Sequence, residues 1–254
     1  MENNSTNPVQ SAGRIFTIME TLAETGPIGL TELSVRLSLH KSTVHRLLTS
    51  LISMGYADQD AISGKYLLTY KLVQQADHLR ENQDFLPLIH PYIVRLCEEC
   101  CETVHLVKRT GNRIIYIDKV ESNVNSIRMG SQLGLTLPMY CTGVGKAIMA
   151  TLPDSEIEEI WKSSDIEAKT DFTITDFKAL INEINNIRKL GYALDNQENE
   201  LGVRCIAIAL PDSTNQAQYA ISVSAPINRM SDERIGTLAV ILGNLRSQTK
   251  CFVI

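Results

Sequence analysis

Six polar or basic side chains lie close together between positions 41 and 49 of the sequence. They are Lys41, Ser42, Thr43, His45, Arg46 and Thr49. Hydroxyl, imidazole and guanidinium groups can donate hydrogen bonds to base edges and phosphates, whereas the solvent face of an ordinary helix is richer in Glu and Lys. The chemistry that these residues indicate is recognition of DNA through hydrogen bonds.

An apolar stripe in the same segment predicts how these side chains are presented. Hydrophobic residues recur at i, i+3, i+4, i+7 and i+8, at Val44, Leu47, Leu48, Leu51 and Ile52. This spacing places one apolar face of a helix against a core. We therefore expect a helix over residues 42–54 whose opposite, polar face points outward.

Two shorter helices are expected before it. Apolar residues at helical spacing predict a first helix over about residues 11–24, which Gly26 and Pro27 end. Thr31 is a good N-cap for a second helix that ends near Ser38, with Leu30 and Val35 at the positions of a hydrophobic staple. Two helices joined by a tight turn form a helix-turn-helix.

A hairpin is expected directly after the three helices. Residues 56–69 hold two short strand-like runs that flank a polar turn at Ser63 and Gly64. Lys65 would lie where a wing meets the phosphate backbone or the minor groove. Trihelical units also serve as protein-binding modules, but the helix order, the polar face and the hairpin together favour a winged helix-turn-helix DNA-binding domain over residues 1–70.

The charge of this segment indicates that it binds DNA as a dimer. Residues 1–80 hold seven Lys or Arg and seven Asp or Glu, whereas residues 81–254 hold 17 basic and 22 acidic side chains, which account for the net charge of −5. A weakly charged surface makes few phosphate contacts, so useful affinity requires two copies that read two half-sites. The acidic remainder of the chain should avoid DNA.

The length of the chain, 254 residues, predicts a second domain. We expect a linker helix over residues 71–85, able to carry a dimer contact, and the second domain over residues 86–254. No stretch approaches the ~18 apolar residues of a membrane span, and no leader is recognisable. Six cysteines without framework spacing suit a reducing compartment, so a cytoplasmic location is expected.

The second domain alternates between strand-like and helical patterns. Strands are expected at residues 103–108, 113–118, 126–129, 192–195, 203–210 and 218–224, and helices at residues 142–151, 155–162, 176–190 and 231–246. Two groups of strands with helices between them predict an α+β domain with an antiparallel sheet, of the kind that senses small molecules.

Cysteines in the second domain offer an alternative interpretation as a metal site. Cys97, Cys100 and Cys101 lie at helical spacing, with His90 and His105 nearby in the sequence. A buried core helix accounts for the same pattern, and no second paired cluster accompanies it. We therefore expect no metal, and keep a metal-sensing body tethered to DNA as the alternative.

Catalytic motifs are absent from the sequence. The segment from Cys141 to Lys146 resembles a phosphate-binding loop, but Tyr140 and Ala147 stand where the Walker pattern requires Gly and Ser or Thr. No nucleophile elbow, paired-histidine helix or dinucleotide fingerprint occurs. We expect neither a catalytic site nor a cofactor, with an enzymatic body as a minor alternative. A binding pocket fits better, because Gly143 opens a helix whose free amides attract carboxylate or phosphate groups.

Several segments resemble the IclR family of bacterial transcription regulators. In the first domain they are residues 29–34, 41–48 and 55–56, and in the second they are residues 137–147, 195–207 and 220–226. The resemblance runs from about Val9 to Arg246. Residues 65–72, 115–122 and 196–205 look most similar to the subgroup that controls breakdown of pectin-derived 2-keto-3-deoxygluconate.

This resemblance implies a GAF-like effector domain, dimers that assemble into tetramers, and a small organic acid as effector. Carried over from family members that bind short keto acids, the effector-binding residues are Gly143, Val144, Asp195, Cys205, Ser222 and Ser224. Val144 stands where Ala is common in the family. Ser222 and Ser224 are two residues apart, so a strand would place both on one face, as a pocket wall requires.

The sequence therefore predicts a homodimeric or homotetrameric regulator that binds double-stranded DNA. A repressor that a keto or sugar acid releases from a palindromic operator is the simplest form, and a ligand-dependent activator is the alternative. DNA contacts are expected from Lys41, Ser42, Thr43, His45, Arg46 and Lys65.

Overall fold

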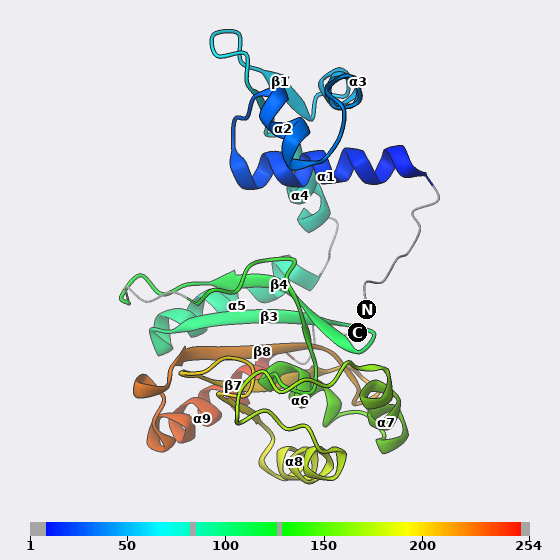
Figure 1. Ribbon diagram of the computed structural model, residues 1–254. Coiled ribbons are helices and arrows are strands. Elements are labelled where there is room, and N and C mark those ends of the chain that lie inside the picture. The colour runs from blue at the N-terminus through cyan, green and yellow to red at the C-terminus, as the bar shows by residue number, and fades with distance from the viewer. Residues whose placement is uncertain (1–8, 82–84, 126–128, 250–254) are drawn as a thin grey trace. The chain divides into compact units, whose positions relative to one another are not determined.

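The computed structural model describes residues 9–81, 85–125 and 129–249. The chain separates into two compact units, residues 1–83 and residues 84–254 (Figure 1). Each unit encloses an apolar core of its own.

The first unit contains three helices, a hairpin and a fourth helix. These are α1 (Gln10–Thr25), α2 (Leu30–Arg36), α3 (Lys41–Ser53), β1 (Ala57–Gln59), β2 (Tyr66–Leu68) and α4 (Lys71–Glu81). The predicted stripe of α3 is buried at Val44, Leu47, Leu48 and Leu51, and it packs with α1, α2 and the hairpin around one core. The expected winged helix-turn-helix is confirmed.

The predicted start of α2 is wrong. The helix begins at Leu30, its N-cap is Gly29, and Val35 is 73% exposed, so Thr31 caps nothing and the expected staple does not form. Ile28 and Tyr66 exchange backbone hydrogen bonds of 3.0 and 2.9 Å. Because this bridge holds Ile28 in an extended conformation, Gly29 becomes the N-cap and the helix begins at Leu30.

Helix α4 is attached to the end of α3 by one lysine. The Lys71 ammonium donates a hydrogen bond of 2.7 Å to the Met54 carbonyl and lies 4.6 Å from the centre of the Tyr56 ring. A cation suits the C-terminal end of a helix, where carbonyl groups lack partners. Lys71 therefore stabilises the junction between α3 and α4.

The second unit is a six-stranded sheet covered by helices on both faces. Its elements are α5 (Phe85–Cys100), β3 (Thr103–Thr110), β4 (Arg113–Val120), β5 (Thr136–Pro138), α6 (Gly143–Met149), α7 (Asp154–Ser163), α8 (Phe177–Leu190), β6 (Ala193–Asn196), β7 (Val203–Pro211), β8 (Ala217–Pro226), the 3-10 turn η1 (Ile227–Arg229) and α9 (Asp232–Thr249). The strand order is β5-β4-β3-β8-β7-β6, and every neighbouring pair is antiparallel.

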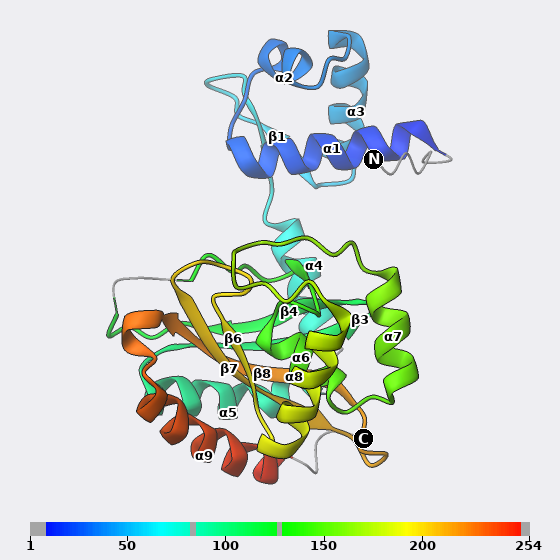
Figure 2. The same cartoon turned by 60° about the horizontal axis from the view of Figure 1, so that its bottom comes forward.

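Alternating strand residues divide the core of this unit into two halves. Val104 and Leu106 of β3 point to the face covered by α5 and α9, whereas Val107 points to the face covered by α6, α7 and α8. Figure 2 shows α5 and α9 together on one side of the sheet and α6 and α8 on the other. The expected α+β domain with an antiparallel sheet is confirmed.

One edge of the sheet differs from the prediction. Of the expected strand at residues 126–129, residues 126–128 lie outside the described part of the chain, and Met129 is in no strand. The sheet instead gains β5, which pairs with β4 from Arg113–Pro138 to Ile115–Thr136. A proline is tolerated in an edge strand, but it weakens the sequence signal of that strand.

Candidate functional site

Helix α3 presents the first candidate surface. Lys41, Ser42, His45 and Arg46 are exposed, and Thr43 is half-buried. Within the described part of the chain, the side chains of Lys41, His45 and Arg46 make no hydrogen bond or ion pair. These cationic and imidazole groups are thus available to an external anion.

The hairpin presents Lys65 beside a well-ordered turn. The Asp60 carboxylate accepts hydrogen bonds of 2.6 Å from both the backbone and the hydroxyl of Ser63, and these bonds lower the Asp60 pKa. Gly64 has a φ of +67°, which only glycine adopts without strain. Lys65 is exposed and follows this turn directly, as the wing interpretation requires.

The second candidate site is a cavity of about 230 Å³ on the α6 face of the sheet. All six residues expected to bind the effector line it: Gly143, Val144, Asp195, Cys205, Ser222 and Ser224. The sequence reasoning missed other lining residues, among them His105, Tyr116, Ser131, Thr142, Asn199 and Glu200.

Helix α6 forms one wall of the cavity because two glycines let it approach its neighbours. The Thr142 hydroxyl caps the helix by accepting a hydrogen bond of 3.2 Å from the Gly145 amide. A Cβ atom on Gly145 would lie only 2.4 Å from the Cα of Met139. A Cβ on Gly143 would lie 3.2 Å from the Asp195 amide nitrogen, so the first turn of α6 packs directly on β6.

Strand pairing forms the opposite wall. Asp195 of β6 lies opposite Cys205 of β7, and Cys205 lies opposite Ser224 of β8. One pleat further along, Ser222 lies opposite His105 of β3. The antiparallel register therefore brings polar side chains from four strands to one region of the sheet face.

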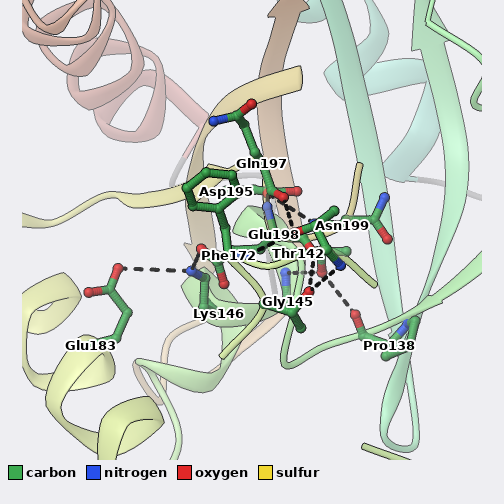
Figure 3. Close-up of polar contacts among 12 residues, drawn as sticks. Pro138, Thr142, Gly145, Lys146, Phe172, Glu183, Asp195, Gln197, Glu198 and Asn199 are labelled. Carbon is green, nitrogen blue, oxygen red and sulfur yellow. Dashed lines mark hydrogen bonds and ion pairs between the residues drawn. The ribbon is translucent and has the colours of Figure 1, made fainter. Parts of the chain in front are cut away.

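Asp195 is the most strongly perturbed acid in the cavity. Its Oδ1 accepts hydrogen bonds of 2.8 Å and 3.3 Å from the amides of Glu198 and Asn199 (Figure 3). Burial and, next, the nearby Glu198 carboxylate raise the Asp195 pKa to about 7, against the opposing effect of these amides and of Lys146. Asp195 can therefore carry a proton near neutral pH.

His105 and Tyr116 form an aromatic wall beside the strands. The His105 imidazole bonds to Ser131 at 2.7 Å and to Ser224 at 3.3 Å, and its ring centre lies 5.0 Å from that of Tyr116. Burial, with a smaller effect of Lys119, lowers the His105 pKa to about 3, so the ring is neutral and donates through one nitrogen only.

A buried ion pair supports the cavity from behind. The Lys146 ammonium, which is fully buried, pairs with Glu198 and lies 3.9 Å from Glu183 (Figure 3). The lysine that resembled a phosphate-loop residue in the sequence therefore contacts two carboxylates instead. Glu198 Oε2 has no hydrogen-bond partner within the described residues, and burial raises the Glu198 pKa.

The cysteine cluster is part of the core. Cys97 and Cys100 are buried, and their thiols donate to the Glu102 carbonyl at 3.2 and 3.7 Å. Burial raises the Cys100 pKa to about 12. Within the described residues, no three His, Cys, Asp or Glu side chains are grouped as a metal site would require.

A signal for His105 existed in the strand pattern. His105 alternates with Val104 and Leu106, so it must point away from the face that these two residues fill. A polar residue on the second, covered face of a strand indicates a cavity wall. The sequence reasoning grouped His105 with the cysteines and missed this alternation.

Comparison with known proteins matches both units of the chain to one family. Residues 78–249 match the family model described as the bacterial transcriptional regulator IclR C-terminal domain, and residues 11–61 match the IclR helix-turn-helix domain. The HTH-type transcriptional regulator KdgR of Escherichia coli strain K12 is 35% identical over 234 residues, which cover 92% of this chain and 89% of that protein.

Two further relatives agree. The transcriptional repressor IclR of Escherichia coli strain K12 is 32% identical over 91% of this chain and 85% of that protein. The crystal structure of the Thermotoga maritima IclR matches with a TM-score of 0.86 and 28% identity, covering 93% of this chain and 96% of that chain. The first is named as a transcriptional repressor, and the second carries the same IclR name. None of the described helices combines the length and apolar character needed to cross a membrane. The chain belongs to the IclR family of DNA-binding bacterial transcription regulators.

Proposed function

We propose that this regulator represses a carbohydrate or organic-acid catabolic operon and is released from its operator by a small keto or sugar acid. The observation that carries the proposal is the convergence of Gly143, Val144, Asp195, Cys205, Ser222 and Ser224 on one cavity. These positions come from four separate elements, so their common location is not a consequence of sequence proximity.

The DNA-binding part of the proposal rests on the free polar face of α3. Lys41, Ser42, His45 and Arg46 are exposed there, and Lys65 is exposed on the hairpin. A dimer would insert two copies of α3 into successive major grooves about 34–36 Å apart on a palindromic operator. Two copies also compensate for the few cations that each hairpin and helix supplies.

The size and lining of the cavity support a small polar effector. A volume of about 230 Å³ lies below the roughly 300–1,000 Å³ of pockets that hold drug-sized ligands. Ser222, Ser224 and Asn199 offer hydroxyl and amide groups to the oxygens of a hydroxylated acid. Leu135, Leu137 and Val203 provide apolar contacts to its carbon chain. A six-carbon keto-deoxy sugar acid such as 2-keto-3-deoxygluconate fits this description.

The relatives point in the same direction. Besides KdgR of Escherichia coli, KdgR of Dickeya chrysanthemi is 34% identical over 89% of this chain, and the acetate operon repressor of Salmonella typhimurium is 30% identical over 93% of it. The Salmonella protein is named as the repressor of an acetate operon, which favours repression over activation for this chain as well.

The proposal is tested by finding the operator and then dissociating the protein from it. Purified full-length protein selects duplexes from a random pool, and sugar and keto acids are then titrated into the complex with the selected duplex. We expect at least one acid, with 2-keto-3-deoxygluconate first in the panel, to weaken DNA binding by roughly 5- to 150-fold.

A pocket variant makes this test specific. Ser222→Ala removes a hydroxyl from the cavity wall, so it should raise the acid concentration needed for release and leave acid-free DNA binding intact. Failure to select any duplex would reject the DNA-binding role, and an acid that acts equally on both proteins would reject the cavity as its site. An acid that instead tightens DNA binding would reject release of the operator by that acid.

A further inference from the structure

The described polar lining of the cavity contains acids but no Lys or Arg side chain. Asp195 and Glu200 line it, and none of its described lining residues is Lys or Arg. Lys119, whose charge acts on His105, donates to the carbonyls of Met129 and Ser131 at 2.8 and 2.7 Å and pairs with Glu121. An anion in this cavity therefore has neutral hydrogen-bond donors but faces a carboxyl group of the same sign.

Asp195 lies where this conflict is greatest. The side chain is buried, and Oδ1 is occupied by the amides of Glu198 and Asn199, whereas Oδ2 has no hydrogen bond within the described residues. Gly143, at the start of α6, packs against the Asp195 backbone. An effector carboxylate in this cavity shares it with Asp195, and two ionised carboxylates that share a buried site repel each other until one takes up a proton.

We propose that the cavity binds an anionic effector together with one proton, which Asp195 holds. This inference rests on the proposed function, since it concerns the acid assigned above to the same cavity. The proton comes from the solvent, and no bond other than the O–H bond of Asp195 is formed. Protonated Asp195 then donates through Oδ2 to an oxygen of the effector.

The other titratable groups that face Asp195 stay neutral over the relevant pH range. Burial raises the pKa of Cys141 to about 12, and it raises the pKa of both Cys205 and Tyr116 even further. The His105 pKa of about 3 keeps that ring uncharged. These four groups therefore neither supply nor accept the proton between pH 5 and pH 8.

The remaining charged groups differ from Asp195 in position. Glu198 is paired with Lys146 behind the cavity and does not line it, and Glu183 lies on the far side of that lysine. Glu200 lines the cavity but is exposed to solvent, which screens its charge. The free Asp195 carboxyl has a pKa of about 7, so it is mostly ionised at pH 8 and needs a proton when an anion binds.

Calorimetry measures the proton directly. 2-Keto-3-deoxygluconate, pyruvate, gluconate and galacturonate are each titrated into the full-length protein at pH 8 in HEPES and in Tris, whose ionisation enthalpies differ. The dependence of the heat on the buffer should give uptake of about 0.9 proton per acid bound at pH 8. The same comparison at pH 5.5, in two buffers that titrate near that pH, should give none, because Asp195 is already protonated. The affinity should fall about tenfold between pH 8 and pH 9.

Two matched variants assign the proton. In Asp195→Asn the amide can still accept the two backbone hydrogen bonds and donates at every pH, so acid binding should persist at pH 8 without proton uptake. Glu200→Gln removes the other lining carboxylate and should leave the proton count of the parent unchanged. Thermal unfolding of both variants verifies that they are folded.

The outcomes separate this inference from the proposed function. Acid binding without proton uptake at pH 8 overturns the inference alone, as does loss of the uptake in Glu200→Gln with its retention in Asp195→Asn. Absence of binding by all four acids at pH 5.5, where Asp195 is neutral, overturns the acid-binding cavity and this inference with it.

Discussion

The buried ammonium of Lys146 on α6 forms an ion pair with the carboxylate of Glu198, in the loop that follows β6. The pair joins two walls of the cavity, since Gly143 and Val144 of α6 and Asn199 of the loop all line it. An ion pair removed from water gains little net stability, but either partner left alone is costly.

Lys146→Met should therefore destabilise the second unit strongly. The substitution leaves the buried Glu198 carboxylate without its cation. Removing one partner of a buried ion pair costs about 3–5 kcal/mol of stability. Urea denaturation followed by circular dichroism measures the free energy of unfolding. The control is the double variant Lys146→Met, Glu198→Leu, which removes both charges and should recover most of the loss. A single variant as stable as the parent would show that the pair is unimportant.

Gly145→Ala should destabilise the protein because its methyl group has no space. The new Cβ would lie 2.4 Å from backbone atoms of Met139, so α6 must move away from the chain before it. We expect a loss of about 1–3 kcal/mol or more.

Gly236→Ala is the matched control for this substitution. Gly236 also lies in a helix, α9, but a Cβ there meets no atom within 4 Å. Alanine should then stabilise the helix by up to about 1 kcal/mol through its higher propensity. Similar effects of the two substitutions on the melting temperature would contradict the close approach of α6.

Asp195→Asn should become more stabilising, relative to the parent, as the pH rises. The Asp195 pKa is raised from 3.8 to about 7 on folding, so between these values the folded parent binds more protons than the unfolded chain and loses stability with increasing pH. The variant has no such loss. The difference in the free energy of unfolding, variant minus parent, should therefore increase by on the order of 2 kcal/mol between pH 5 and pH 8. A constant difference across this range would contradict the raised pKa.

Arg46→Ala should weaken operator binding while leaving effector affinity nearly unchanged. Arg46 is exposed on α3, and its side chain has no partner within the described residues. Loss of one DNA contact costs about 1–3 kcal/mol, and specificity relaxes at one position if that contact is to a base, whereas a phosphate contact weakens all duplexes alike. Lys162→Ala, which removes an exposed charge from α7, is the control in the same fluorescence anisotropy titration. Equal binding by parent and Arg46→Ala would reject Arg46 as a contact.

Local patterns were sufficient to predict most elements. The stripe from Val44 to Leu51 specified α3, and the alternation at residues 103–108 and 218–224 specified β3 and β8. Strand β5 was missed, because three residues that end in Pro138 carry almost no periodic signal. The start of α2 was misplaced because a long-range bridge, from Ile28 to Tyr66, determines it.

The candidate site was only partly predictable for a related reason. The family resemblance named six effector-binding residues, Asp195 and Ser222 among them. The structure places all six around one cavity. His105 was missed although its alternation with Val104 and Leu106 was a local signal, whereas its pairing with Ser222 of β8, more than 100 positions away, has none. The pairing of Lys146 with Glu198 spans 52 positions and likewise has no local signal.

We propose that an acid in the cavity of the second unit controls DNA binding by the first. Isothermal titration of the acid, with and without saturating operator duplex, tests it most directly, together with anisotropy titration of the duplex with and without saturating acid. Linkage requires the operator to weaken acid binding by the same factor by which the acid weakens operator binding, roughly 5- to 150-fold. Acid that binds with one affinity whether or not the duplex is present would contradict the account.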